Sequence, residues 1–95
     1  MIRIVDYGVG NIQAFLNMFK RLDLPAERAK APADLADATR LILPGVGSFD
    51  HAMTLLNRSG LREPLEARVM GERVPVLGVC VGMQMLAGGS DEGQL

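Results

Sequence analysis

The chain contains a single cysteine, Cys80, and the residues around it have the spacing of a nucleophile elbow. Residues 78–82 read Gly-Val-Cys-Val-Gly and lie between an apolar run and a helical pattern. A nucleophile on such a strained turn needs small neighbours, and the positive end of the following helix favours a thiolate. A lone cysteine is otherwise most often a buried apolar residue. The spacing instead predicts a reactive Cys80, with the Val81 N–H placed to donate to an oxyanion.

Two further glycine loops are expected at the same edge of the sheet. Residues 8–11 (Gly-Val-Gly-Asn) follow the first apolar run, and residues 44–47 (Pro-Gly-Val-Gly) follow the third. Ligands of open α/β sheets bind at the carboxyl ends of the strands, where such loops meet. Backbone N–H groups of residues 44–47 could face an anion there. The Gly-x-Gly of residues 8–10 is not a dinucleotide fingerprint, because Gln13 stands where the third glycine belongs.

A catalytic cysteine needs a base, and the only histidine of the chain is His51. It follows Ser48 by three residues in a helical pattern, which favours an ordinary exposed position on a helix. The sequence has no Cys/His set with zinc spacing and no Gly-x-x-x-x-Gly-Lys phosphate loop. We therefore expect neither a metal nor another cofactor.

Short apolar runs alternate with helical patterns along the whole chain. Strands are expected over residues 2–6, 27–30, 41–43 and 76–79, the third closed by a turn at residues 44–45. This alternation predicts an α/β fold, an open parallel sheet with helices on both faces. The expected helical stripes are Ile12, Phe15, Leu16, Phe19 and Leu22; a turn around Leu35; Phe49, Met53 and Leu56 after a Ser48 cap; Leu61, Leu65 and Val69; and Met83, Leu86 and Ala87.

The composition is that of a globular domain. Of the 95 residues 48% are hydrophobic and 22% charged, which excludes a disordered chain. The net charge of −1 and the scattered basic residues argue against nucleic acid or an anionic membrane as a partner. No apolar stretch reaches a membrane span, and the N-terminus does not resemble a signal peptide. With one cysteine, the chain suits the reducing cytoplasm.

The sequence ends in a polar segment directly after the fourth strand-helix unit. A sheet that stopped there would leave the strand over residues 76–79 with an open apolar edge. We therefore expect residues 1–95 to be the N-terminal half of one larger domain, and a small complete four-stranded domain is the alternative.

Three motifs occur in a fixed order: Asp-Tyr-Gly-Val-Gly-Asn at residues 6–11, Leu-Pro-Gly-Val-Gly-Ser-Phe at 43–49 and Gly-Val-Cys-Val-Gly-Met-Gln at 78–84. Together they resemble the class I (triad-type) glutamine amidotransferases, and the resemblance covers the whole chain. Within that family it is greatest for the glutaminase subunits of imidazole glycerol phosphate synthases, in histidine biosynthesis. The resemblance implies a flavodoxin-like sheet that this chain contains only in part.

The resemblance also implies a role for individual residues. Cys80 would attack the side-chain amide of glutamine, form a γ-glutamyl thioester and release ammonia. A (β/α)8-barrel synthase subunit would receive the ammonia as the partner in a heterodimer. Further roles would fall to Val81 and to the backbone of Gly45, Val46 and Gly47 as oxyanion donors, to Gln84 and Glu92 as glutamine ligands, and to Gly8, Val9, Gly10 and Asn11 at the partner interface.

The family's catalytic histidine and glutamate lie downstream of this chain, and His51 does not match that histidine. We therefore expect residues 1–95 alone to be inactive. Three alternatives stay open: a paralogue that feeds another synthase, for instance in surface-sugar amidination; a non-catalytic flavodoxin-like module with a structural Cys80; and another elbow-cysteine enzyme, protease-like or chaperone-like.

Overall fold

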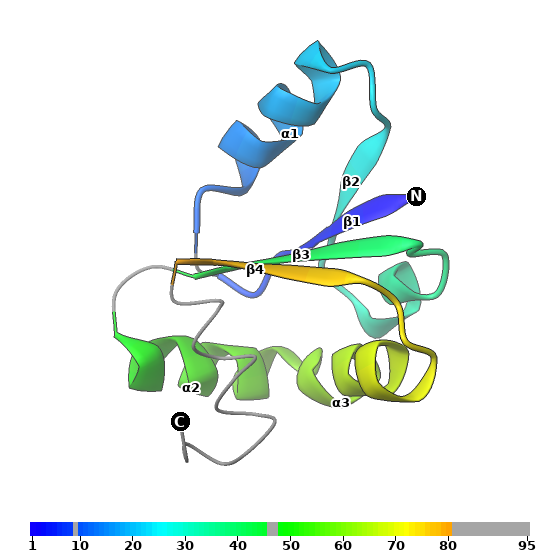
Figure 1. The fold of residues 1–95 in the computed structure, drawn as a ribbon. Coiled ribbons are helices and arrows are strands. Elements are labelled where there is room, and N and C mark those ends of the chain that lie inside the picture. The colour runs from blue at the N-terminus through cyan, green and yellow to red at the C-terminus, as the bar shows by residue number, and fades with distance from the viewer. Residues whose placement is uncertain (9, 46–47, 81–95) are drawn as a thin grey trace.

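The computed structural model describes residues 1–8, 10–45 and 48–80, which form a parallel sheet between two layers of helices (Figure 1). The strand order is β2-β1-β3-β4. This order and the helices on both faces confirm the predicted α/β class. The strands are β1 (Ile2–Val5), β2 (Ala26–Ala29), β3 (Arg40–Gly45) and β4 (Val76–Cys80).

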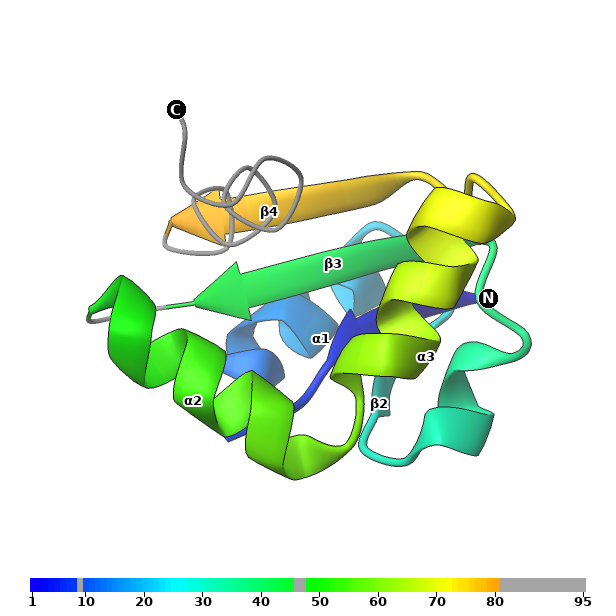
Figure 2. The ribbon, with the colours of Figure 1, turned by 90° about the horizontal axis from the view of Figure 1, so that it is seen from below.

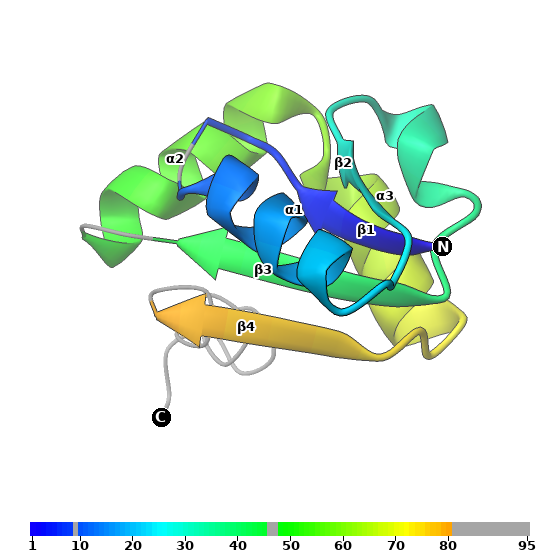
Figure 3. The same ribbon diagram turned by 90° about the horizontal axis from the view of Figure 1, so that it is seen from above.

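Helix α1 (Ile12–Arg21) covers one face of the sheet (Figure 3). The other face carries α2 (Phe49–Ser59) and α3 (Arg62–Glu66), as Figure 2 shows. A 3-10 helix, η1 (Pro32–Leu35), lies between β2 and β3, and a π-helix, η2 (Ala67–Gly71), continues α3. In the described ranges, no helix has both the length and the apolar character needed to cross a bilayer.

Side chains of β1 and β3 alternate between two hydrophobic clusters, because successive residues of a strand face opposite sides of the sheet. Ile4 and Ile42 pack with Ile12 under α1. Leu41 and Leu43 belong to the larger cluster beneath α2 and α3, and each is only 1% exposed. Both faces of the central strands are therefore buried, as the continuous apolar runs in the sequence predict.

The predicted stripe on α1 is confirmed except at its end. Phe15, Leu16 and Phe19 pack against the cluster around Ile12. Leu22 is 59% exposed, because α1 ends at Arg21 and Leu22 is the residue that caps it. Including Leu22 in the buried face was wrong.

Strand β3 is longer than the sequence analysis predicted. Pro44 and Gly45, expected in a turn, continue the strand and pair with Val79 and Cys80 of β4. A proline interrupts a sheet when its missing N–H should serve a neighbouring strand. On the β1 side, pairing with β3 has already ended at Ile42, so Pro44 costs that ladder no hydrogen bond.

The predicted Ser48 cap of α2 is present, and the structure adds a glycine cap at the other end of the helix. The Ser48 side chain accepts a hydrogen bond of 3.2 Å from the His51 N–H at the start of the helix. Gly60 ends α2 in the left-handed conformation at φ +78°, which an L side chain rarely adopts. These caps define where α2 begins after β3 and where it ends before α3.

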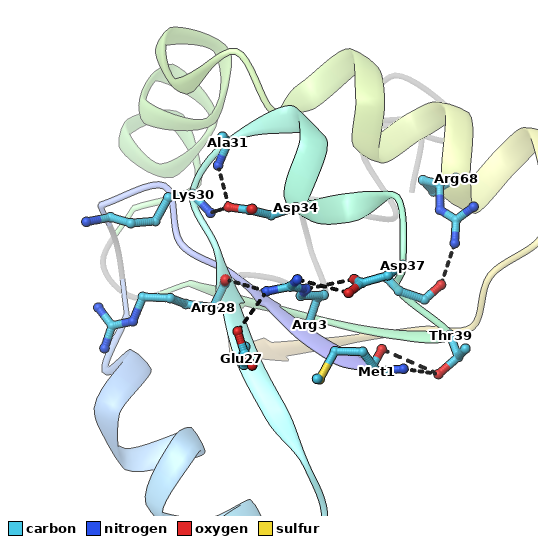
Figure 4. Close-up of polar contacts among 11 residues, drawn as sticks. Met1, Arg3, Glu27, Arg28, Lys30, Ala31, Asp34, Asp37, Thr39 and Arg68 are labelled. Atoms are coloured by element: carbon cyan, nitrogen blue, oxygen red, sulfur yellow. Dashed lines mark hydrogen bonds and ion pairs between the residues drawn. The ribbon is translucent and has the colours of Figure 1, made fainter.

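An ion-pair cluster around Arg3 joins β1 to the segment after η1 (Figure 4). The Arg3 guanidinium donates two hydrogen bonds to the Asp37 carboxylate, of 2.9 and 3.0 Å, and one to the Arg28 carbonyl. Glu27 lies 3.5 Å from the same guanidinium. The hydrogen bond from Arg3 holds the pKa of Asp37 below its ordinary value of 3.8.

Replacing Asp37 with asparagine is expected to destabilise the protein at neutral pH and to have little effect in strong acid. Because the folded-state pKa of Asp37 is lowered, its contribution is complete above pH 3.8 and disappears as the pH falls through the folded value. Urea unfolding at neutral and acid pH measures this. Glu27→Gln is the control, since Glu27 makes a single longer contact with Arg3; equal pH dependence in both variants would contradict the prediction.

Candidate active site

The order of the strands reverses between β1 and β3. From β1 the chain passes to β2 on one side of the sheet, and β3 then lies on the other side of β1. In open parallel sheets ligands bind at this switch point, outside the carboxyl ends of the strands. The segment after β1, the end of β3 and the end of β4 all reach this edge, as the sequence analysis predicts.

The sheet register brings Cys80 next to the predicted oxyanion loop. Cys80 is the last residue of β4, and its backbone lies directly opposite Gly45, the last residue of β3. Gly45 is buried, and Pro44 beside it is less than 2% exposed. Cys80, the predicted nucleophile, and Gly45, in the predicted oxyanion loop, therefore lie side by side on neighbouring strands.

The segment after β1 contacts the end of β3 at two points. The hydroxyl of Tyr7 donates a hydrogen bond to the carbonyl oxygen of Pro44. Gly10 lies so close to the Pro44 ring that a Cβ added to Gly10 would be 2.9 Å from the Pro44 Cβ. Tyr7 is 5% exposed, and burial raises its pKa to about 12. The Tyr7 hydroxyl therefore remains a donor at physiological pH.

Tyr7 is a site residue that the sequence analysis missed. The sequence analysis includes Tyr7 in the motif of residues 6–11 but assigns it no role. A signal was present in the sequence, since the only tyrosine of the chain follows directly after a buried strand. A tyrosine that is buried almost always finds a partner for its hydroxyl.

The remaining residues after β1 have distinct local roles. Gly8 and Gly10 have φ values of +99° and +98°, a region open to glycine. Asn11 is exposed and caps α1, because its side chain accepts a hydrogen bond of 3.1 Å from the Ala14 N–H. Gly8 is exposed and Gly10 is half-buried. The partner interface expected for residues 8–11 stays a prediction.

His51 is exposed on α2, as the sequence analysis predicts. Its backbone N–H is engaged by the Ser48 side chain at the helix start. Among the residues that the structure describes, no group of three or more His, Cys, Asp and Glu side chains could hold a metal ion.

Several expected site residues lie outside the described residues. These are Val9, Val46, Gly47, Val81, Gln84 and Glu92. Their roles as interface, oxyanion or glutamine-binding residues stay predictions.

Comparison with known proteins supports the reading of the motifs. The family model "Glutamine amidotransferase class-I" matches residues 3–90. A solved structure described as a glutamine amidotransferase has the same fold, with a TM-score of 0.72 and 22% sequence identity. The match covers 85% of this chain and 42% of the chain in that structure.

Curated relatives match the chain over nearly its full length. "Imidazole glycerol phosphate synthase subunit HisH" of Bdellovibrio bacteriovorus is 64% identical over 95 residues, which are all of this chain and 47% of that protein. The protein of the same name from Leptospira interrogans is 52% identical over 93 residues, which are 98% of this chain and 46% of that protein. The chain thus spans about half the length of these relatives. The match of the family model over residues 3–90, which is most of the chain, shows that the chain belongs to the class I glutamine amidotransferase family.

Proposed function

We propose that the full-length protein is a glutaminase subunit that hydrolyses glutamine and passes the ammonia to a synthase subunit in histidine biosynthesis. The observation that carries this proposal is the pairing of Cys80 with Gly45 at the carboxyl edge of the sheet, within a chain of this family. The HisH names of the relatives favour histidine biosynthesis over the amidination of surface sugars.

The proposed reaction has two steps. The Cys80 thiol would give its proton to the base, and the thiolate attacks the side-chain carboxamide carbon of glutamine. The C–N bond then breaks, the nitrogen takes that proton from the base and leaves as ammonia, and the γ-glutamyl thioester remains on Cys80. Water then attacks the thioester and gives glutamate and the free thiol. The Val81 N–H and the backbone of residues 45–47 would stabilise the oxyanion in both steps. Gln84 and Glu92 would hold the substrate.

We also propose that this chain forms the N-terminal half of one catalytic domain. The lengths of the relatives support this, as does β4, whose Leu77 is 59% exposed at the outer edge of the described sheet. The base and its acidic partner would lie in the other half, so residues 1–95 alone would not turn over glutamine.

Each of these relatives is named as a subunit of a synthase, and this name supports a heterodimer with a synthase partner. The partner would be a (β/α)8-barrel that receives ammonia next to residues 8–11. Because a catalytic thiol must stay reduced, we place this chemistry in the cytoplasm.

Labelling with a glutamine-mimicking electrophile, 6-diazo-5-oxo-L-norleucine, tests the proposal. In the full-length protein we expect one label per chain, located at Cys80 by mass spectrometry. Glutamine at ten times its dissociation constant should slow the labelling about tenfold, because it occupies the same site. Cys80→Ala is the control that should take no label.

Two results would contradict the proposal. An unlabelled Cys80 would favour a non-catalytic module. Labelling that glutamine does not slow would indicate an elbow-cysteine enzyme with another substrate.

A further inference from the structure

The hydrogen bond from Tyr7 to Pro44 joins two elements far apart in the sequence. The Tyr7 hydroxyl donates to the Pro44 carbonyl across 37 positions of the chain. Both residues are buried, Tyr7 to 5% exposure and Pro44 to less than 2%. Gly10 packs against the ring of the same proline. The end of β3 is thus held by the segment that follows β1.

The direction of this bond determines where the next N–H group points. Leu41 donates its N–H to Pro75 before β4, at 2.9 Å, so Leu41 faces β4. Backbone groups alternate along a strand, so Gly45 also faces β4 and Pro44 faces β1. A trans peptide is planar, with its C=O and N–H on opposite sides. With its carbonyl oxygen held by Tyr7, the Pro44–Gly45 peptide directs the Gly45 N–H towards the strand that ends at Cys80.

We propose that Tyr7 is a positioning residue for glutamine hydrolysis, which fixes the Pro44–Gly45 peptide, the end of β3 that lies opposite Cys80. This inference rests on the proposed glutaminase function. Preorganised donors stabilise an oxyanion better than donors that must reorient during the reaction, so an anchored peptide lowers the barrier of the chemical step. Tyr7 acts through Pro44 and has no contact with glutamine in this proposal.

Burial keeps the anchor in its donor form. The pKa of Tyr7 is raised to about 12, so the phenol stays protonated wherever the enzyme works. Phenylalanine preserves the ring and removes the hydroxyl alone. Tyr7→Phe therefore breaks the contact with the Pro44 carbonyl and retains the packing of the ring.

The experiment compares two reactions of Cys80 in the full-length protein with its synthase partner. Glutamine hydrolysis passes through an oxyanion, and alkylation by iodoacetamide does not. For Tyr7→Phe we expect kcat for glutamine to fall about tenfold, which corresponds to about 1.4 kcal/mol in the barrier. KM and the alkylation rate should stay within about twofold, because glutamine binding and the thiolate are unchanged. Assays are run at a temperature at which denaturation curves show both proteins folded.

Thr54→Val is the control, because Thr54 also donates its hydroxyl to a backbone carbonyl, that of Asp50 at 2.9 Å, and lies exposed on α2. It should change neither reaction. Unchanged kcat in Tyr7→Phe, or an equal loss in kcat and alkylation, would overturn the positioning role and leave the proposed function intact. A wild-type protein that labels normally with iodoacetamide but does not hydrolyse glutamine would overturn the proposed function itself.

Discussion

Replacing Cys80 with alanine in the full-length protein is expected to lower glutamine hydrolysis by about a thousandfold or more. In enzymes with covalent intermediates, removing the nucleophile lowers the rate by factors of this size, because no other group in the site can form the intermediate. Cys80 is the only cysteine of residues 1–95, and it ends β4 opposite Gly45. Steady-state ammonia release from glutamine measures the effect.

A second assay separates chemistry from damage to the fold. If the synthase partner is supplied with ammonium salts in place of glutamine, the Cys80→Ala complex should work at the wild-type rate, because ammonia bypasses the thioester. Cys80→Ser is a useful companion variant, since a hydroxyl at this position is a much weaker nucleophile at neutral pH. Glutaminase activity that persists in the alanine variant would exclude Cys80 as the nucleophile.

Replacing Gly10 with alanine is expected to destabilise the folded protein by about 2 to 5 kcal/mol. Two costs add up at this position. The backbone has a φ of +98°, which costs an L side chain about 1 to 2 kcal/mol. The new Cβ would also lie 2.9 Å from the Pro44 Cβ and 3.3 Å from its Cγ, and overpacking of buried atoms costs about 1 to 3 kcal/mol.

Gly8→Ala is the matched control for this experiment. Gly8 has nearly the same φ, +99°, yet a Cβ built there would meet no atom of the described residues within 4 Å. The smaller conformational freedom of alanine in the unfolded chain affects both variants equally. The difference between their unfolding free energies in urea therefore isolates the contact with Pro44. Equal losses in the two variants would show that Pro44 does not confine Gly10.

Local patterns were sufficient for most of the elements. The stripe of Ile12, Phe15 and Phe19 predicts α1, and Ser48 predicts the start of α2, because helix periodicity and capping depend on residues a few positions apart. The apolar run over residues 76–79 predicts β4 in the same way. At the end of β3, local reasoning was wrong because of a distant contact. Pro44 belongs to a strand because β4 pairs with it and the ladder to β1 has already ended.

The features of the candidate site also fall into two groups, those that local patterns predict and those that depend on distant contacts. From its spacing alone, the sequence predicts that Cys80 follows a strand and that glycine loops share its edge of the sheet, since a nucleophile elbow is defined within five residues. The strand order, the register that places Cys80 opposite Gly45, and the bond from Tyr7 to Pro44 were decided only by the tertiary structure. These features join residues more than twenty positions apart, and their free energy arises only when strands pair and bury their side chains together.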